Sequence, residues 1–178
     1  MHPPNPTPLE ITRFDSCDST NRLLLSAAEF GAPTGSVYVA REQSAGRGRR
    51  GRTWVADPGC TLAFSLLRTF PVDPVALSGL SLAVGVGIMR ALSNPTLGAL
   101  KTGYQFGLKW PNDILLRRPD GTDGKAGGIL IESVVRRTPD GMREMAVVIG
   151  VGLNCLPSAS VDAAVTDQSV AALADAYL

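Results

Sequence analysis

The sequence predicts an α+β domain with a mixed, largely antiparallel sheet flanked by helices. Apolar, β-branched runs of strand length fill the second half of the chain, and turn tripeptides such as Pro119-Asp120-Gly121 and Pro139-Asp140-Gly141 separate them. This direct strand–turn–strand order favours an antiparallel meander with helices on one side. The chain has 178 residues, 44% of them hydrophobic, which is enough to bury a core without disulfides or metals.

The first half of the chain predicts two helices and two strands. Residues 18–21 (DSTN) cap a helix of about three turns that ends before Gly31. Residues 35–42 alternate like a strand, and residues 60–70 are apolar on both faces, which predicts a central strand. Asp73-Pro74 opens a second helix, whose apolar residues keep helical spacing at Leu77, Leu80, Val84, Ile88 and Ala91.

The second half predicts four strands. Residues 108–110 and 114–118 flank the turn Pro111-Asn112-Asp113, and further strands cover residues 128–136 and 144–151. The last segment, 168–178, is predicted to begin a helix. Residues 1–8 hold four prolines and are expected to form an unstructured arm, so residues 9–178 form the domain.

Charge and residue usage exclude several classes of function. Seventeen basic residues face sixteen acidic ones, which argues against a globally basic nucleic-acid binder. The three cysteines, Cys17, Cys60 and Cys155, form no CxxC pair and fit a reducing cytoplasm. His2 is the only histidine and lies in the proline-rich arm, which removes His-dependent catalytic sets and metal sites. No signal peptide or spanning segment of ~20 apolar residues is present.

The segment 46–52 (GRGRRGR) is the most informative one. Glycines allow close approach of the backbone to a ligand, and guanidinium groups are forked donors that suit phosphate and carboxylate. Such a loop can fold over a triphosphate and neutralise developing charge. A solvated basic loop and an RG-type RNA-binding segment are alternatives, whereas a P-loop is excluded because no Gly-Lys-Ser/Thr follows.

Three further segments each have a functional and a structural interpretation. Residues 109–113 (KWPND) present polar groups at a strand end or form an ordinary turn. In residues 125–132 (KAGGILIE), the lysine before two glycines points into a cleft or is an exposed hairpin lysine. Residues 150–154 (GVGLN) allow a ligand to approach a strand or only narrow it for packing.

Taken together and in this order, these segments closely resemble biotin protein ligases, which adenylate biotin and attach it to a carrier lysine. The matching pieces are Ser19-Thr20-Asn21, Gln43 with the loop 46–52, Trp54, KWPND, KAGGILIE and GVGLN, and they span residues 19–154. The resemblance implies a catalytic core like that of class II aminoacyl-tRNA synthetases. It also implies that the biotin carboxylate attacks the α-phosphate of ATP, and that a lysine of a biotin carboxyl carrier domain then displaces AMP.

The resemblance also implies site residues. Catalysis is assigned to Lys125, Arg47, Arg49 and Asp113. Biotin binding is assigned to Ser19, Thr20, Asn21, Gln43, Gly46, Arg47, Gly48, Arg49, Lys125, Gly127 and Gly128. ATP or adenylate binding is assigned to Arg49, Arg50, Arg52, Trp54, Lys109, Asn112, Lys125 and Asn154. ATP and biotin are the expected substrates and Mg²⁺ accompanies the nucleotide, with no protein side chain assigned to the metal.

Some features depart from relatives of this kind. Nothing before Ser19 is long enough for the helix-turn-helix of some relatives, so we expect a ligase without a DNA partner. No membrane partner is expected, because no spanning segment is present, and a homodimer is left open. Many relatives continue after this point into a further helix and a small β-barrel domain, and we expect this sequence, which ends 24 residues after Asn154, to lack that domain either as a fragment or as a short form. Val170 stands where some relatives place a tryptophan over the adenine.

Three other functions remain as alternatives. The first is a lipoate- or octanoate-transferring relative, the second a non-catalytic biotin-binding or regulatory module, and the third an RNA-binding protein. The near-neutral charge and the low aromatic content, 6%, argue against the last.

Overall fold

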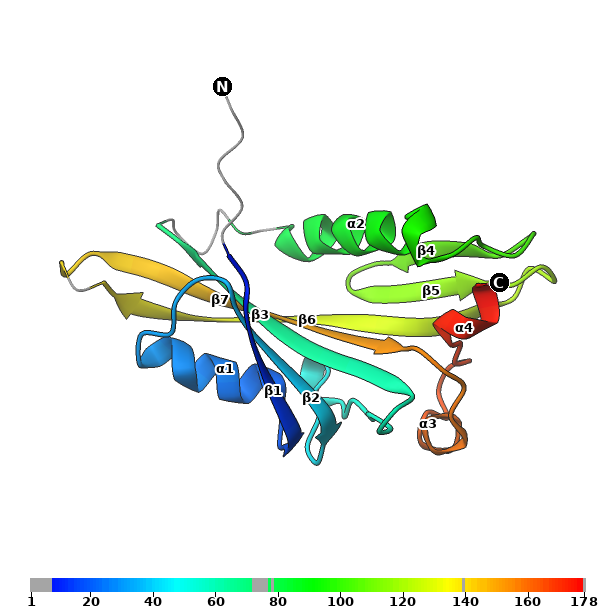
Figure 1. Cartoon of the computed structure of the whole chain (residues 1–178), viewed down its shortest axis with the longest axis horizontal. Coiled ribbons are helices and arrows are strands. Elements are labelled where there is room, and N and C mark those ends of the chain that lie inside the picture. Colours follow the sequence, from blue (N-terminus) through cyan, green and yellow to red (C-terminus); the bar gives the residue numbers. More distant parts are fainter. Residues whose placement is uncertain (1–7, 72–76, 78, 139, 178) are drawn as a thin grey trace, which may run out of the picture.

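The computed structural model describes residues 8–71, 77, 79–138 and 140–177. One sheet holds seven strands in the order β1-β2-β3-β7-β6-β5-β4 (Figure 1). The strands are β1 (Glu10–Cys17), β2 (Ser36–Gln43), β3 (Thr61–Phe70), β4 (Gln105–Lys109), β5 (Asp113–Arg117), β6 (Asp123–Arg137) and β7 (Arg143–Asn154). Only β1 and β2 pair in parallel, and every other pair is antiparallel. The predicted mixed, largely antiparallel sheet is confirmed.

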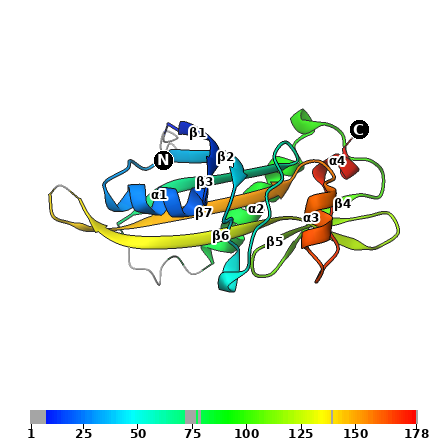
Figure 2. The same ribbon diagram turned by 90° about the horizontal axis from the view of Figure 1, so that it is seen from below.

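The two longer helices cover opposite faces of the sheet. Helix α1 (Thr20–Glu29) packs on β3, β6 and β7, and helix α2 (Leu80–Leu92) packs on β4 and β6. Figure 1 shows α1 below the sheet, together with the loop after β2 and the short helix α3 (Ala159–Ala164), and α2 above it. Figure 2 views the molecule from the α1 side. A four-residue helix, α4 (Leu173–Ala176), ends the described chain.

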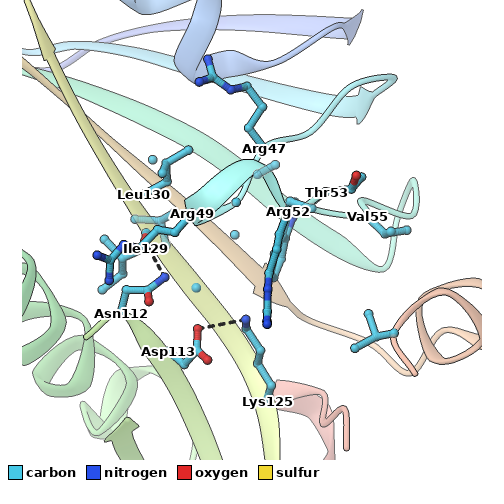
Figure 3. Close-up of a pocket in the computed structure, with 18 of the residues that line it drawn as sticks. Arg47, Arg49, Arg52, Thr53, Val55, Asn112, Asp113, Lys125, Ile129 and Leu130 are labelled. Atoms are coloured by element: carbon cyan, nitrogen blue, oxygen red, sulfur yellow. Dashed lines mark hydrogen bonds and ion pairs between the residues drawn. The ribbon is translucent and has the colours of Figure 1, made fainter. Parts of the chain in front are cut away.

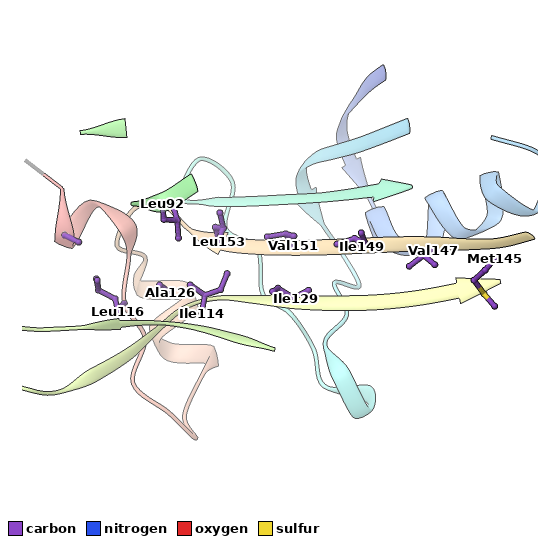
Figure 4. Packing of buried hydrophobic residues seen from close by; sticks show 12 residues of the cluster. Leu92, Ile114, Leu116, Ala126, Ile129, Met145, Val147, Ile149, Val151 and Leu153 are labelled. Atoms are coloured by element: carbon purple, nitrogen blue, oxygen red, sulfur yellow. The ribbon is translucent and has the colours of Figure 1, made fainter. Parts of the chain in front are cut away.

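Each face has its own apolar cluster. The larger one lies on the α2 face and includes alternate residues of β7 (Figure 4). Its buried members are Leu92, Ile114, Leu116, Ala126, Ile129, Met145, Val147, Ile149, Val151, Leu153, Ala171 and Ala176. On the α1 face, Leu24 and Ala28 pack against Leu67, Ala146 and Val148. The strand periodicity of two therefore separates two cores along one sheet.

Most of the predicted elements are present. Helix α1 begins after Ser19, and Gly31 adopts a φ of 93° that terminates it, as the sequence indicates. Strands β2, β3, β5 and β7 match the predicted ranges to within a few residues. Strand β1 was not predicted, because both of its faces are largely exposed and the sequence shows no apolar alternation there.

Several predictions need correction. The prediction that the helices lie on one side of the sheet is wrong, because α1 and α2 cover opposite faces. The predicted helix start at Asp73-Pro74 and residues 1–7 of the predicted arm 1–8 lie outside the described residues. Helix α2 begins at Leu80, after Gly79 with a φ of 89°. The C-terminal segment is helical only at Leu173–Ala176. Strand β6 begins at Asp123, so Lys125 lies within the strand and not before it.

Candidate active site

A cavity of about 770 Å³ lies on the α1 face of the sheet. The start of α1, the loop after β2, the turn between β4 and β5, and the segment after β7 surround it. The residues predicted for the site that line this cavity are Ser19, Thr20, Asn21, Gln43, Arg47, Gly48, Arg49, Arg50, Arg52, Trp54, Lys109, Asn112, Asp113, Lys125, Gly128 and Asn154. Segments far apart in the sequence therefore meet at one site.

The structure places Gly46 and Gly127 outside the lining of the cavity. A Cβ atom at Gly46 would lie 2.3 Å from the carbonyl oxygen of Trp54, and one at Gly127 would lie 2.6 Å from the carbonyl oxygen of Gly152. Both distances are shorter than any van der Waals contact allows. These two glycines therefore permit close backbone packing behind the site.

A hydrogen-bonded group of polar side chains forms the end of the cavity near α1. The backbone N–H of Thr20 donates to Gln43 Oε1 at 2.8 Å. Ser65 Oγ, which is fully buried, lies 2.8 Å from Thr20 Oγ1 and donates to Asn21 Oδ1 at 2.6 Å. Asn21 fits here because Gly150 has no side chain: a Cβ there would lie 2.1 Å from Asn21 Oδ1. This end of the cavity is rigid and polar.

The indole of Trp54 covers the middle of the same sheet face. A Cβ atom at Gly152 would lie 2.3 Å from the Trp54 ring, and one at Gly128 would lie 3.6 Å from it. The backbone of Trp54 is held by its N–H, which donates to the carbonyl of Gly46 at 2.9 Å. Among the described residues, buried Trp54 Nε1 has no hydrogen-bond partner. Glycines on β6 and β7 thus make room for an aromatic wall.

The arginine-rich loop is a small hairpin. Arg47 and Thr53 form an antiparallel bridge, and the N–H of Gly48 donates to the carbonyl of Arg52 at 2.7 Å. Arg50 at its tip has a φ of 57°, a left-handed conformation that few residues other than glycine adopt. The hairpin therefore holds its arginines at defined positions over the α1 face of the sheet.

The arginines of this hairpin point in different directions (Figure 3). Arg49 extends toward Asn112, and Arg52 is directed to the side where Lys125 lies. Arg52 also pairs with Asp167 at 3.2 Å, although both side chains are largely exposed. Arg47 points the other way and donates from Nη2 to Glu132 Oε1 at 2.7 Å. Only part of the arginine set therefore faces Lys125.

An ion pair between Lys125 and Asp113 marks the other end of the cavity. Lys125 Nζ lies 2.9 Å from Asp113 Oδ1, and the two side chains are only 18% and 19% exposed. Lys125 lies on β6 and Asp113 begins β5, where the register shifts between Ile114 and Leu115. Next to them, Asn112 Nδ2 donates to the carbonyl of Ile129 at 3.0 Å. Partial burial strengthens this pair relative to a surface salt bridge.

The segment after β7 closes the cavity over Asn154. Asn154 Nδ2 donates to the carbonyls of Lys125 and Ala171 at 3.1 and 3.3 Å. Within the part of the chain that the structure describes, its buried Oδ1 has no partner. Val170 also lines the cavity and bridges to Lys125. A buried amide oxygen without a partner in the protein can accept a hydrogen bond from a ligand or from an ordered water.

The comparisons with known proteins agree with this geometry. Residues 13–154 match the family model described as the biotin/lipoate A/B protein ligase family. This chain belongs to that family. The bifunctional ligase/repressor BirA of Escherichia coli is 38% identical over 137 residues, which cover 77% of this chain and 38% of that protein. The biotin--[acetyl-CoA-carboxylase] ligase of Mycobacterium tuberculosis is 38% identical over 138 residues, covering 76% of this chain and 46% of that one.

Solved structures of the family share the fold. Biotin protein ligase from Leishmania major in complex with biotinyl-5-AMP superposes with a TM-score of 0.68 and 26% identity, covering 97% of this chain and 64% of that one. The enzyme from Aquifex aeolicus in complex with biotin and ATP gives 0.63 and 26%, covering 93% and 60%. The expected biotin protein ligase core, a class II synthetase-like fold, is confirmed. The chain spans less than half the length of the first two curated relatives above.

Two residues that support the site of this biotin/lipoate ligase domain from outside the cavity lining are not among the predicted ones. Ser65 lies within the predicted apolar strand 60–70, and Glu132 is the last residue of the segment KAGGILIE. Ser65 joins Thr20 to Asn21, and Glu132 accepts from Asn21 Nδ2 at 3.0 Å as well as from Arg47. A signal was present for Ser65, a single polar residue inside the apolar run 62–67, and for Glu132, a charged residue that directly follows the apolar run 129–131.

Metal sites and membrane-spanning helices are two further features on which the described residues bear. Among the described residues, no group of three or more His, Cys, Asp and Glu side chains could hold a metal ion. The described helices include none that is long and apolar enough to cross a membrane. Among the described residues, the chemistry that the cavity offers is that of cations, amides and two ion pairs, Lys125 with Asp113 and Arg52 with Asp167.

Proposed function

We propose that this chain is the catalytic domain of an ATP-dependent biotin ligase. It would form biotinyl-5'-AMP and transfer biotin to a lysine of a biotin carboxyl carrier domain. The observation that carries the proposal is one cavity with two chemically different ends. Thr20 and Gln43 offer amide and hydroxyl groups at one end, and Lys125 and Asp113 form an ion pair at the other. An elongated ligand with a polar head and a carboxylate tail matches this arrangement.

The polar end suits the ureido group of biotin. Gln43 lies on β2 and Asp113 on β5, with β3, β7 and β6 between them. Strands are spaced about 4.8 Å apart, so a ligand reaching both ends would span several strands. Ser19, Thr20 and Gln43 would hold the ureido ring. Trp54 lies between the two ends, where the valeryl chain and the adenylate would meet.

The cationic end suits adenylation. A carboxylate oxygen of biotin forms a bond to the α-phosphorus of ATP, and the bond from that phosphorus to the pyrophosphate oxygen breaks. Because both reactants are anionic, fixed cations must offset their repulsion. Lys125, oriented by Asp113, would hold the carboxylate and then the adenylate phosphate. Arg49, Arg50 and Lys109 would neutralise the departing pyrophosphate, with Arg52 nearby.

Mg²⁺ would enter with the nucleotide. The side-chain oxygens of Asn112 and Asp113 are ligands of the kind that Mg²⁺ prefers. Asn112 Nδ2 donates to the carbonyl of Ile129, so the amide oxygen of Asn112 is the atom that would contact the ion. The ion would neutralise phosphate charge. These two side chains would share it with the phosphates, because no larger acidic cluster lines the cavity among the described residues.

The adenine would lie near Asn154. Its unpartnered Oδ1 can accept a hydrogen bond from the exocyclic amine of adenine, which guanine does not carry at that position. Val170 would contact the base without aromatic stacking.

In the second step the acceptor amine attacks the acyl carbon of the biotinyl-adenylate, and AMP leaves. Asp113 would orient the amine or accept its proton. DNA binding and a dimer form no part of this proposal.

A cytoplasmic location is proposed on separate grounds. Cys17, Cys60 and Cys155 are all free thiols. Burial raises the pKa of the Cys155 and Cys17 thiols, which reduces their reactivity. Free thiols of this kind are typical of a reducing compartment.

Biotin-dependent exchange of labelled pyrophosphate into ATP tests the first half-reaction without a carrier. We expect exchange with biotin and Mg²⁺ but not with lipoate. Biotin binding without exchange would favour a non-catalytic binding module. Exchange with lipoate but not with biotin would show that lipoate is the substrate, and it would overturn the proposal.

The charge argument predicts two damaging substitutions. Lys125→Ala and Arg49→Ala should each lower the exchange rate by about 10²–10³, since each removes a cation aimed at developing charge. Circular dichroism should show that both variants are folded. Arg117→Ala is the matched control, because Arg117 lies on β5 near the cavity but pairs at the surface with Asp123 and does not line the site. Near-normal exchange in both site variants would contradict the assigned roles.

A further inference from the structure

We propose that Glu132 is a positioning residue which holds Arg47 and thereby fixes the arginine hairpin over the cavity. Glu132 lies on β6 opposite Val148, so its side chain is on the α1 face. It does not line the cavity. Nothing in the assigned chemistry uses it, yet both of its carboxylate oxygens are bonded to residues that do line the cavity.

The first of these contacts connects Glu132 to the rigid end of the site. Its Oε2 accepts from Asn21 Nδ2 at 3.0 Å, and the same nitrogen donates to the carbonyl of Leu130 at 3.2 Å. Asn21 is in turn fixed by Ser65 and by the close approach of Gly150. The carboxylate is therefore held in place from the sheet side.

The second contact reaches the hairpin. Glu132 Oε1 accepts from Arg47 Nη2 at 2.7 Å, and the exposed fractions of the two side chains are 21% and 44%. Arg47 is the first arginine of the hairpin and bridges to Thr53, next to Trp54. Fixing Arg47 thus fixes the strand pair that carries Trp54 onto Gly152.

This geometry gives Arg47 a different role from Arg49. Figure 3 shows the Arg47 side chain directed away from Asp113 and Lys125, whereas Arg49 extends toward Asn112. A guanidinium paired with a carboxylate has its single positive charge offset, so it screens phosphate charge poorly. Arg47 and Glu132 therefore act together as an anchor, and the cations for adenylation are Lys125 and Arg49.

Tryptic cleavage of the ligand-free chain tests the anchor without any substrate. Cleavage after Arg50 reports how often the hairpin opens, because proteolysis follows the population of the open form. In Glu132→Gln, which keeps size and polarity but removes the charge, we expect cleavage there to be about five to ten times faster. The matched control is Glu144→Gln on β7, which weakens an ion pair to Arg136 of the same 2.7 Å length, remote from the cavity.

A double-mutant cycle tests whether the effect passes through Arg47. Arg47→Met should open the hairpin as much as Glu132→Gln, and the double variant should be no worse than either. Arg47→Lys should recover part of the protection. With substrates present, Glu132→Gln should raise KM for biotin about as much as it raises cleavage and change kcat by less than twofold.

Three results would overturn the anchor. They are unchanged cleavage in Glu132→Gln, cleavage no faster than in Glu144→Gln, and additive effects in the double variant. The KM measurement rests on the proposed function, whereas the cleavage measurement does not. Faster cleavage in a chain that shows no pyrophosphate exchange would therefore keep the anchor and reject the ligase assignment.

Discussion

The two faces of strand β7 carry opposite kinds of residue. On the α2 face, Met145, Val147, Ile149, Val151 and Leu153 are all buried and aliphatic. On the α1 face, Ala146 and Val148 pack under the helix, and the next positions along the strand are Gly150, Gly152 and Asn154. Both faces share one hydrogen-bond ladder with β3 and β6.

The cavity lies where the α1 face of β7 carries glycines. The site has room because one face of β7 carries glycines, whereas the other face of the same strand is fully packed. Each aliphatic side chain buried on the α2 face contributes about 1.5–3 kcal/mol of hydrophobic stabilisation. The glycines on the α1 face contribute little, but they admit Asn21 and Trp54 to the sheet surface. Substitutions on the two faces should therefore damage different properties.

Among substitutions on the two faces of β7, the largest expected effect comes from filling the cavity face. Gly152→Val places a side chain where the Trp54 ring lies, because even a Cβ atom would be 2.3 Å from it. The ring sits at the end of a side chain on the hairpin, so it can move while the sheet stays intact. We expect biotin affinity to fall by about 100-fold, which corresponds to ~2.7 kcal/mol. Isothermal titration measures the affinity, and the fluorescence of Trp54 reports its displacement.

Gly107→Val is the matched control for this substitution. Gly107 also lies in a strand, β4, but a Cβ atom there meets open space. Biotin affinity and tryptophan fluorescence should stay as in the unaltered chain. Equal losses in both variants would mean that valine harms the sheet itself, and the cavity explanation would fail.

The packed face should show the reverse pattern. Ile149→Ala removes buried methyl groups between the sheet and its α2-side neighbours, and the expected loss of unfolding free energy is about 2–4 kcal/mol. KM for biotin should change by less than twofold, because Ile149 does not line the cavity. Urea unfolding and pyrophosphate exchange measure the two quantities. Val86→Ala, on the exposed side of α2, should change stability by under ~0.5 kcal/mol.

The strands were predictable because their signals are local. The turns at 119–121 and 139–141 and the β-branched runs between them fix β5, β6 and β7 without knowledge of the fold. The face taken by each helix is not local. Helix α2 has apolar residues nearly all round, including exposed Leu82 and Val86, so its periodicity did not indicate which face of the sheet it would cover.

The site was predictable in composition but not in its internal links. The resemblance indicated Arg47, Arg49 and Lys125 by their place in motifs, and all three line one cavity. It did not show that Arg47 turns to Glu132 while Arg49 turns to Asn112. The direction of the Arg47 side chain depends on Glu132, which lies 85 residues away in the sequence. A local sequence pattern contains no information about such a contact.

The smallest expected effect concerns the connection between the two sides of the cavity mouth. Asp57, in the segment after the hairpin, accepts from Ser158 and Ser160 at 2.5 and 2.9 Å, and Ser158 caps α3. These hydrogen bonds, first that from Ser158, lower the pKa of the Asp57 carboxyl. Asp57→Asn should raise KM for ATP about twofold, since α3 contributes Val161 to the cavity.

The lowered pKa fixes the direction of the pH dependence. A carboxylate favoured in the folded state stabilises α3 above its ordinary pKa of 3.8, and the contribution disappears as the pH falls below that value. The backbone amide signal of Val161 should therefore shift only as the pH falls below about 3.8 in the unaltered chain and stay nearly constant in Asp57→Asn. Asp120→Asn is the control, because the pKa of Asp120 is also lowered but its partner is Thr122, in the turn before β6. A shift that persists in Asp57→Asn and disappears in Asp120→Asn would remove Asp57 from the connection.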